Sequence, residues 1–315
     1  MTMHLNERAA RVADRLVADA EALGVAVSRV AGARVVDAGV EVPASLGAGL
    51  MLARVCLADL GSVAIVPGRV GQVALPSVAV RVDHPVAACM ASQYAGWRIK
   101  VDEFFAMASG PMRAAAKSED LFDQIGFTET PSCAVGVMEA AVLPGAGVIA
   151  HVAERSGVRP ERLSLLVAPT ASMAGGLQIV ARSVETAMHK LHEMKFDLAR
   201  IVGGFGVAPL PPVAADDLKG LGRTNDAILY GAEVTLLARG DDRTLAEAAR
   251  RLPSEASADY GRPFAEVFKD HDHDFYKIDP MLFSPASVCV QNVQTGKSHR
   301  AGSVNEQVLL ESFFG

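Results

Sequence analysis

An apolar strand, a tight turn and an amphipathic helix are expected in succession between residues 163 and 194. Leu163 to Ala168 is apolar except for Ser164, and Pro169-Thr170-Ala171-Ser172 follows it as a turn. From Met173 to Met194, apolar residues recur at spacings of three and four, which is typical of one buried helix face. A strand that enters a helix through a tight turn is typical of α/β proteins, where polar groups at the strand's carboxyl end meet a helix N-terminus.

The polar residues of this predicted helix also share a face. A rotation of about 100° per residue brings five of them into one stripe roughly 80° wide. They are Gln178, Arg182, Glu185, His189 and His192. Thr170 or Ser172 would cap the helix by accepting a hydrogen bond from its first free amides. An Arg and a Glu three residues apart usually form a surface ion pair worth about a few tenths of a kcal/mol, so this spacing alone assigns no chemistry.

Helical and strand patterns alternate along the chain, which predicts a mixed α/β (α+β) fold. We expect helices at residues 6–23, 46–60, 85–94, 148–156 and 216–221, a hairpin within 25–42, and strands at 63–67, 77–82, 133–137, 163–168, near 201, at 233–238 and within 275–293. With 315 residues, 50% of them apolar, the chain can form two domains. We place these at residues 1–165 and 166–315, a boundary that shifts if the domains are discontinuous.

Composition excludes several classes of partner. A net charge of -6 without a basic block argues against nucleic acid and against an anionic membrane surface. The longest uncharged run, residues 163–181, is broken by Pro169 and two glycines, so no transmembrane helix is expected. The first 15 residues lack an apolar leader, which favours the cytoplasm. A small molecule or another protein chain remains as partner, and the surplus of apolar residues fits a subunit interface.

Neither the cysteines nor the histidines form a metal-binding pattern. The four cysteines, Cys56, Cys89, Cys133 and Cys289, are scattered and are interpreted as reduced structural thiols. The consecutive residues 270–274, which include His271 and His273, cannot all converge on one ion, so we interpret them as a solvated acidic loop and expect no metal. A metal-dependent hydrolase using these two histidines is an alternative. Residues 203–206 lack the G-x-G-x-x-G spacing and are interpreted as a structural turn.

Further polar residues stand where helices are expected to begin or end. Ser109-Gly110-Pro111 precedes Arg113, and free amides at a helix start beside an arginine would receive an anion. Gln93 lies near the end of the helix expected at 85–94. Asn225 and Asp226 would cap an apolar segment, and for either residue alone capping is the simpler interpretation.

Taken together, these stretches resemble the methenyltetrahydromethanopterin cyclohydrolase family. The resemblance runs from about residue 6 to about residue 296, and several independent motifs in one order make it more specific than any single motif. The motifs are Ala91-Ser92-Gln93-Tyr94-Ala95-Gly96-Trp97, Ser109-Gly110-Pro111, Pro169-Thr170-Ala171-Ser172, Ala181-Arg182-Ser183-Val184-Glu185-Thr186, Gly206-Val207-Ala208-Pro209-Leu210-Pro211-Pro212 and Arg223-Thr224-Asn225-Asp226. Ala108 stands where the resemblance leads us to expect Gly.

The resemblance implies a cytoplasmic enzyme of one-carbon metabolism that reversibly hydrolyses 5,10-methenyl-tetrahydromethanopterin to the 5-formyl derivative and serves formaldehyde oxidation in bacteria. It implies a two-domain fold with the substrate in the cleft between the domains, a homotrimer, and a catalytic pair at Arg182 and Glu185. The pterin is the substrate, and no bound cofactor is expected. We further expect substrate contacts from Gln93, Ser109, Gly110, Arg113, Thr170, Ser172, Asn225 and Asp226. A non-catalytic pterin-binding or carrier protein is the alternative.

Overall fold

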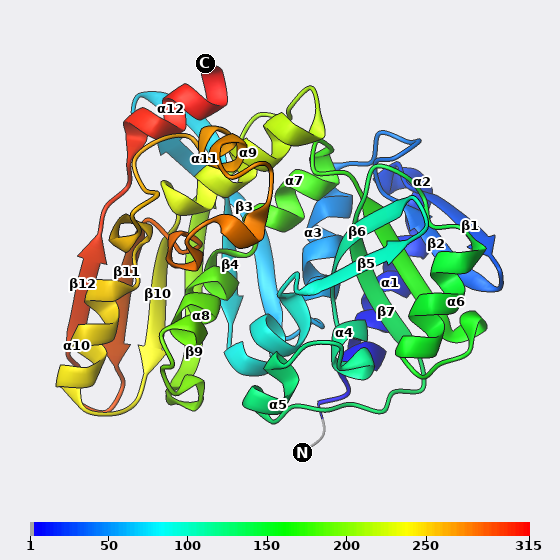
Figure 1. Ribbon diagram of the computed structural model, residues 1–315, viewed down its shortest axis with the longest axis horizontal. Coiled ribbons are helices and arrows are strands. Elements are labelled where there is room, and N and C mark those ends of the chain that lie inside the picture. Colours follow the sequence, from blue (N-terminus) through cyan, green and yellow to red (C-terminus); the bar gives the residue numbers. More distant parts are fainter. Residues whose placement is uncertain (1–2) are drawn as a thin grey trace. The chain divides into compact units, whose positions relative to one another are not determined.

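The computed structural model describes residues 3–315, apart from the side chain of Tyr276, and has the mixed α/β fold that the sequence predicts (Figure 1). The chain divides into two compact units, each with its own six-stranded sheet. Unit 1 comprises the residues up to Gly61 together with Ala87–Gln178, and unit 2 comprises Ser62–Val86 and Ile179–Gly315. Both units are discontinuous, so the division falls at three points in the sequence and none of them is the predicted 165/166.

Unit 1 contains the strands β1, β2, β5, β6, β7 and β8. They span Ala26–Val30, Ala33–Asp37, Trp97–Val101, Phe104–Ser109, Ala134–Glu139 and Leu163–Ala168. Its helices are α1 (Leu5–Ala18), α2 (Ala20–Leu23), α3 (Leu46–Cys56), the π-helix η1 (Val86–Gln93), α4 (Met112–Ala116), α5 (Leu121–Ile125), α6 (Ala146–Arg155), the short η2 (Pro160–Arg162) and α7 (Met173–Val180), whose last two residues fall to unit 2.

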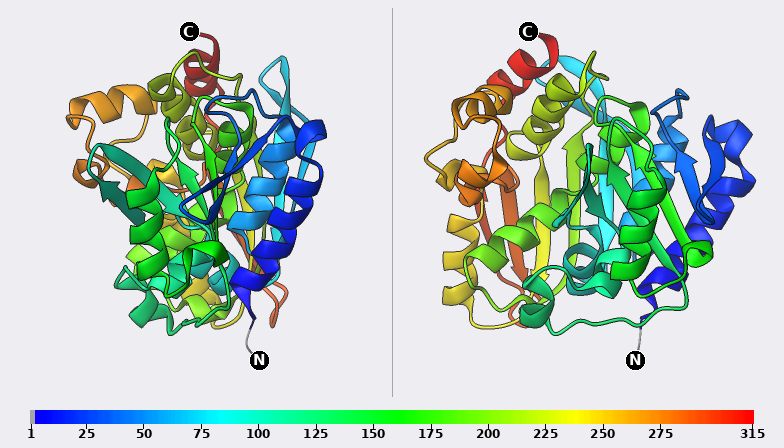
Figure 2. Two further views of the ribbon diagram at one scale, coloured as in Figure 1. Left: turned by 90° about the vertical axis from the view of Figure 1, so that its right-hand side faces the viewer. Right: turned by 45° about the vertical axis from the view of Figure 1, so that its right-hand side comes forward.

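The strand order of the unit 1 sheet is β1-β2-β8-β7-β6-β5. The three central strands β2, β8 and β7 are parallel, and antiparallel strands complete both edges. One face packs against α6, where Val148, Ile149 and Val152 join a buried cluster, and the other packs against α1, α3 and the start of α7. The helices α1 and α3 contact each other along the second face, and they lie side by side in both views of Figure 2.

Unit 2 contains the strands β3, β4, β9, β10, β11 and β12. They span Gly61–Val70, Val73–Val82, Ile201–Pro209, Glu233–Ala238, Ser287–Asn292 and Ser298–Gly302. Its helices are α8 (Ser183–Glu193), α9 (Asp217–Leu229), α10 (Asp242–Arg251), α11 (Phe264–Asp270) and α12 (Glu306–Phe314). Short 3-10 turns are η3 (Leu198–Arg200), η4 (Ser254–Ala256), η5 (Phe275–Lys277) and η6 (Pro280–Leu282).

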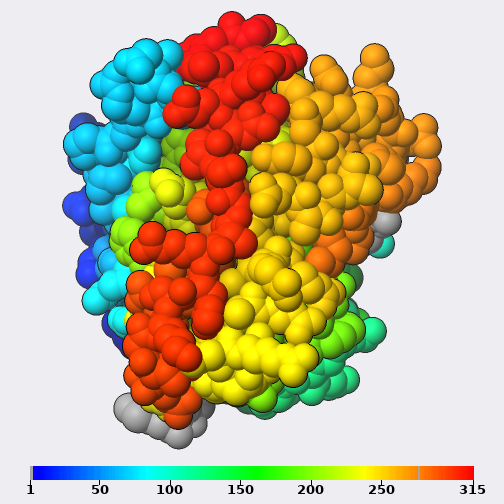
Figure 3. All heavy atoms as spheres, turned by 90° about the vertical axis from the view of Figure 1, so that its left-hand side faces the viewer, coloured from blue at the N-terminus to red at the C-terminus, as the bar shows by residue number. Residues whose placement is uncertain are grey.

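The strand order of the unit 2 sheet is β12-β11-β10-β9-β4-β3, and only the β10–β11 pair is described as parallel. The helix α8 packs on β9, β10 and β4. The helix α10 packs on β11 and β12, and Figure 3 shows its yellow segment beside the orange and red chain of these strands. The β3–β4 hairpin therefore joins a sheet whose other strands come from the second half of the chain.

Several sequence predictions fall on the observed elements. The strands predicted at 163–168 and 233–238 coincide with β8 and β10, and Gly24 ends the first helical segment in the left-handed region (φ 65°). The prediction of strands within 275–293 is confirmed for β11. It is wrong for residues 275–282, which contain two 3-10 turns. The helix predicted at 216–221 continues to Leu229. None of the described helices is long and apolar enough to span a membrane.

Candidate active site

The helix predicted to run unbroken from Met173 to Met194 is two helices, α7 and α8. The backbone N–H of Arg182 donates to the carbonyl of Ile179 (3.0 Å), three residues back, and the ladder restarts when the N–H of Thr186 donates to the carbonyl of Arg182 (2.9 Å). Apolar spacing cannot reveal such a break, because both helices bury their apolar residues. The predicted stripe of five polar residues is therefore interrupted, and Gln178 belongs to unit 1, whereas Arg182 and Glu185 belong to unit 2.

The break places the predicted catalytic pair at the start of α8. Arg182 is the N-cap residue (φ -91°, ψ 9°) and Glu185 lies in the first turn. The exposed fractions of the two residues are only 8% and 4%. Because free amides and aligned peptide dipoles give a helix N-terminus a partial positive charge, this is a favourable position for a carboxylate. The structure thus combines a buried cation with a buried acid at one helix end.

Two glycines of β9 allow the first turn of α8 to approach the sheet. A Cβ at Gly204 would lie 2.6 Å from Cγ1 of Val184, and a Cβ at Gly206 would clash with Oγ of Ser183. Residues 203–206 are thus part of a strand, and their interpretation as a turn was wrong. The glycines serve close packing of a helix on a sheet, a function that residue spacing along the chain does not reveal.

The Pro169-Thr170-Ala171-Ser172 turn connects β8 to α7, as the sequence predicts. Oγ of Ser172 accepts a hydrogen bond from the N–H of Gly175 (2.9 Å) and donates one to the carbonyl of Pro169 (2.8 Å). Ser172 is therefore the N-cap of α7, and of the two residues predicted as possible caps it is the one that forms the hydrogen bond. Thr170 and Ser172 are both partly exposed, which keeps them accessible to a ligand. Their contact with the substrate stays a prediction.

Ser109 and Gly110 lie at the end of β6, beside a buried cysteine. Oγ of Ser109 is 3.2 Å from Sγ of Cys56. Gly110 has a φ of 91°, a conformation that side chains disfavour, and its N–H donates to the carbonyl of Ser92 (2.8 Å). This bond ties the turn to η1, whose last residue, Gln93, is fully buried. Ser109, Gly110 and Gln93 thus come together inside unit 1.

Arg113, the predicted anion ligand, is fully buried in α4 and bonds to partners within unit 1. Its Nε and Nη2 donate to the carboxylate of Glu119, and its Nη1 donates to the carbonyls of Met90 (3.1 Å) and Ser92 (3.3 Å). The guanidinium also lies 5.0 Å from the ring centre of Tyr94. These contacts give Arg113 a structural role; anion binding stays a prediction that would require some of them to be exchanged. No sequence pattern indicates Glu119 as its partner.

Asn225 and Asp226 lie inside α9, where both bond to backbone groups of unit 2. Nδ2 of Asn225 donates to the carbonyl of Leu221 (2.9 Å) in the same helix. Oδ1 of Asp226 accepts from the N–H of Phe264 (2.8 Å), the first residue of α11. Asp226 is fully buried, and this burial raises its pKa to about 7. The expected capping of the apolar segment after these residues is wrong, because both lie in the interior of α9, whose N-cap is Asp216. Substrate binding by either residue stays a prediction.

The two histidines of the acidic loop have separate surroundings. Nε2 of His271 lies 3.5 Å from a carboxylate oxygen of Asp259, whereas the ring of His273 packs edge-on against Phe268. Among the described residues, the one group with metal-ligand atoms close together is His4, Glu7 and Glu129, far from this loop in the sequence. The alternative that His271 and His273 share a metal therefore finds no support in their contacts.

Known proteins are similar to this chain over nearly its whole length. A family model described as cyclohydrolase (MCH) matches residues 4–313. A protein from Rhodopirellula baltica is 49% identical over 90% of this chain and 87% of its own length, one from Methylobacterium organophilum is 46% identical over 98% and 97%, and one from Methanococcoides burtonii is 41% identical over 90% and 89%. All three are named methenyltetrahydromethanopterin cyclohydrolase. The chain belongs to this cyclohydrolase family.

Gln178, which the sequence placed in the polar stripe of the predicted helix, has partners in unit 1 that the sequence did not reveal. Nε2 of Gln178 donates to the carboxylate of Glu139 (3.2 Å) at the end of β7, and Sγ of Cys56 donates to Oε1 of Gln178 (3.7 Å). Cys56 was interpreted only as a structural thiol, and Glu139 was not singled out. No local motif marks them, because their proximity results from the fold.

Proposed function

We propose that this chain is a methenyltetrahydromethanopterin cyclohydrolase, which reversibly hydrolyses 5,10-methenyl-tetrahydromethanopterin to the 5-formyl derivative. The observation that carries the proposal is the family match over residues 4–313, together with relatives of that name at 41–49% identity. A buried Arg and Glu at the start of α8 give this activity a candidate catalytic pair. The substrate carbon is already an electrophile, since it belongs to an amidinium-like cation, so its hydrolysis requires no metal.

In the proposed mechanism Glu185 is the general base. It removes a proton from water as the water oxygen bonds to the methenyl carbon, which gives a neutral tetrahedral adduct. The protonated Glu185 then returns the proton to N10 as the bond between this nitrogen and the carbon breaks. Loss of the hydroxyl proton from the adduct leaves the formyl group on N5, so one proton is released per turnover.

Arg182 would orient the Glu185 carboxylate and favour its charged form, or help to polarise the water. It precedes Glu185 by three residues across the first turn of α8, a spacing at which side chains are neighbours. Its planar guanidinium presents several donors in a fixed geometry, which suits the orientation of a carboxylate. Arg182 therefore acts mainly by positioning the base.

We further propose the localisation, the oligomeric state and the metabolic role of the enzyme. The resemblance of the chain to its family supports a cytoplasmic homotrimer that takes part in formaldehyde oxidation, with the pterin as substrate and no bound cofactor. The abundant apolar residues, 50% of the chain, are consistent with a subunit interface. Size-exclusion chromatography with light scattering would test the trimer directly.

The activity is tested by following the absorbance of the methenyl group in the presence of the intact protein. Hydrolysis well above the spontaneous rate is the expected result. Tight pterin binding without accelerated hydrolysis would instead identify a carrier protein and overturn the proposal. A second arm repeats the assay after treatment with a chelator; full retention of activity is expected, and its loss together with a stoichiometric bound metal would favour a metal-dependent hydrolase.

A further inference from the structure

The carboxyl end of β7 in unit 1 has a position at which α/β sheets bind ligands. β7 and β8 are parallel neighbours, with Glu139 opposite Ala168 at their ends. The chain leaves β7 for α6 on one face of the sheet and leaves β8 for α7, whose Ala174 packs on the opposite face. Figure 1 shows α6 in front of β7, with α1 and α3 behind the strands. Ligands bind where connections from adjacent parallel strands diverge in this way, because the loops separate to leave a crevice.

The residues at this divergence point are polar. Glu139 is the last residue of β7, and the Pro169-Thr170-Ala171-Ser172 turn follows β8. Glu139, Thr170 and Ser172 are all partly exposed, in contrast to the fully buried strand β8 that lies between them in the sequence. Gly39, after β2, leaves room for Ser172, since a Cβ at position 39 would lie 2.6 Å from Cβ of Ser172. This end of the sheet thus combines one carboxylate with two hydroxyl groups.

A series of hydrogen-bonded, buried side chains contacts the Glu139 carboxylate. Nε2 of Gln178 donates to Oε1 of Glu139 (3.2 Å), and Oε1 of Gln178 accepts from Sγ of Cys56 (3.7 Å), which also lies 3.2 Å from Oγ of Ser109. Gln178, Cys56 and Ser109 are at most 1% exposed. Buried polar groups are costly unless they are satisfied, so this network gives a partly exposed carboxylate a defined orientation. Such pre-organisation is typical of ligand-binding residues.

We propose that Glu139 binds the pyrimidine edge of the pterin, and that Gln178 is its positioning residue. The 2-amino-4-oxopyrimidine ring presents a ring N–H beside an exocyclic amino group, two donors in one plane. A carboxylate accepts both in a bidentate contact, whereas an amide offers one acceptor beside a donor. The inference rests on the proposed function only for the identity of the ligand, and it adds a substrate contact that the sequence did not reveal.

The test uses Glu139→Gln in the full-length protein, which preserves side-chain size. Three quantities are measured. They are KM and kcat for methenyl-tetrahydromethanopterin, and the calorimetric affinity for 6-methyl-tetrahydropterin, a fragment with the heterocycle but without the methenyl carbon and the long side chain. We expect KM to rise about tenfold or more with kcat nearly unchanged, and fragment binding to weaken by a similar factor. The matched control is Glu103→Gln, at an exposed turn residue between β5 and β6 of the same unit, which should change none of these quantities.

Gln178→Met tests the positioning residue, because it retains the length of the side chain and removes the donor to Glu139. We expect a smaller rise in KM than for Glu139→Gln, and no further rise when the two substitutions are combined. Additive effects in the double variant would overturn the role assigned to Gln178. Thermal unfolding of each variant identifies any that fail to fold, and Glu139→Asp, which retains the charge, should recover part of the affinity.

The outcomes separate the inference from the proposed function. Unchanged fragment binding in Glu139→Gln overturns the contact with the heterocycle, whatever the effect on KM. A fall in kcat alone would also overturn it, since a binding contact acts on KM. If the wild type binds the fragment through Glu139 but does not hydrolyse the methenyl substrate, the proposed activity fails and the pterin contact stands.

Discussion

Unit 2 contains two pairs in which an acidic residue follows an arginine by three positions, and the two pairs have different surroundings. Arg182 and Glu185 are three residues apart on α8, and Arg223 and Asp226 are three apart on α9. The first pair stands at the N-terminus of its helix. The second lies in the helix interior, where no free amides are left to a ligand. The position within the helix therefore distinguishes two motifs that appear equivalent in the sequence.

The α9 pair connects elements of unit 2 to one another. Nε of Arg223 donates to the carbonyl of Ser312 in α12 (3.2 Å), and its Nη1 donates to the carbonyls of Pro212 and Val213 (3.3 Å each). Asp226 accepts from α11, as described above. The Arg-x-x-acid motif of α9 thus stabilises the packing of two helices and a loop. A sequence motif with an acid and a base can be retained for such a structural reason as well as for chemistry.

The largest expected difference between the two pairs is in catalysis. Glu185→Gln removes the proposed base without changing side-chain size, so kcat should fall by about 100-fold or more. Asp226→Asn keeps the acceptor for the N–H of Phe264, and kcat should stay close to that of the wild type. The kcat of each variant is measured from the rate at which the methenyl absorbance is lost. Near-normal turnover by Glu185→Gln would disprove its role as base, whereas a raised KM for Asp226→Asn would support the predicted pterin contact.

A second expectation concerns how α8 is held on the sheet. Gly206→Ala introduces a methyl group against Oγ of Ser183, displaces the first turn of α8, and should reduce kcat by about tenfold to a hundredfold. The additional substitution Ser183→Ala removes the contacted oxygen, which has no hydrogen-bond partner among the described residues. Partial recovery of kcat in the double variant is the expected result. If Ser183→Ala gives no recovery, this steric explanation is wrong.

The third expectation is a pH-dependent difference in stability between the wild type and Asp226→Asn. Burial raises the pKa of Asp226 from 3.8 to about 7, so between these values the folded protein holds a proton that the unfolded chain has lost. The stability of the wild type relative to the variant should thus fall as pH rises from about 4 to 7, by an amount of order a few kcal/mol. Denaturant unfolding across this range measures it, and a constant difference would contradict the prediction.

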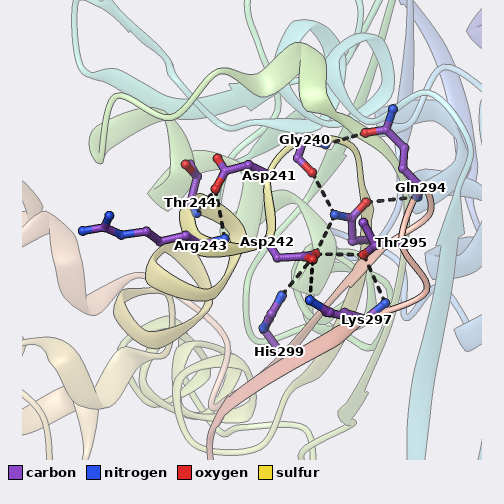
Figure 4. Close-up of polar contacts among 10 residues, drawn as sticks. Gly240, Asp241, Asp242, Arg243, Thr244, Gln294, Thr295, Lys297 and His299 are labelled. Carbon is purple, nitrogen blue, oxygen red and sulfur yellow. Dashed lines mark hydrogen bonds and ion pairs between the residues drawn. The ribbon is translucent and has the colours of Figure 1, made fainter.

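The smallest effect is expected at Asp242, which occupies the first turn of α10 as Glu185 does in α8. Figure 4 shows its carboxylate beside Lys297 and Thr295 of the β11–β12 hairpin, and Nδ2 of Asn292 also donates to it (2.8 Å). The hydrogen bonds from these three residues lower the pKa of Asp242 to about 2. A depressed pKa stabilises the fold above about pH 4 and loses this effect as pH falls toward 2. Asp242→Asn should lower Tm at pH 7 by at most about 3 °C and have little effect at pH 2. An equal decrease in Tm at pH 7 and at pH 2 would indicate that the variant loses stability through its missing hydrogen bonds and not through its missing charge.

Local sequence patterns predicted strand limits and helix caps better than they predicted whether a helix or strand continues without a break. The limits of β8 and β10 follow from short apolar runs between turn residues, and Ser172 was identified as a cap from its position before a helix. The break at Arg182 was missed, because the apolar spacing is the same on both sides of it. β9 was missed in part, because its glycines resemble a turn unless the helix packed against them is known.

The candidate site could be predicted only where its residues belong to a motif. Arg182 and Glu185 were assigned a role through the family resemblance, whereas the contact between Gln178 and Glu139, which are 39 residues apart, was not predicted. Such pairs depend on sheet order and on how helices cross the strands, and neither is visible in residue spacing. The buried partners of Arg113 were missed for the same reason.

The interleaved division of the chain has a consequence for its synthesis. The strands β3 and β4 leave the ribosome early, yet β4 pairs with β9, which is made more than a hundred residues later. Until then the hairpin has an open edge, and open strand edges promote association between chains. Pro67 in β3, the edge strand of the finished sheet, lacks an N–H and reduces this risk on one strand. Because each unit is assembled from two separate segments, neither unit can be expressed as one uninterrupted fragment of this chain.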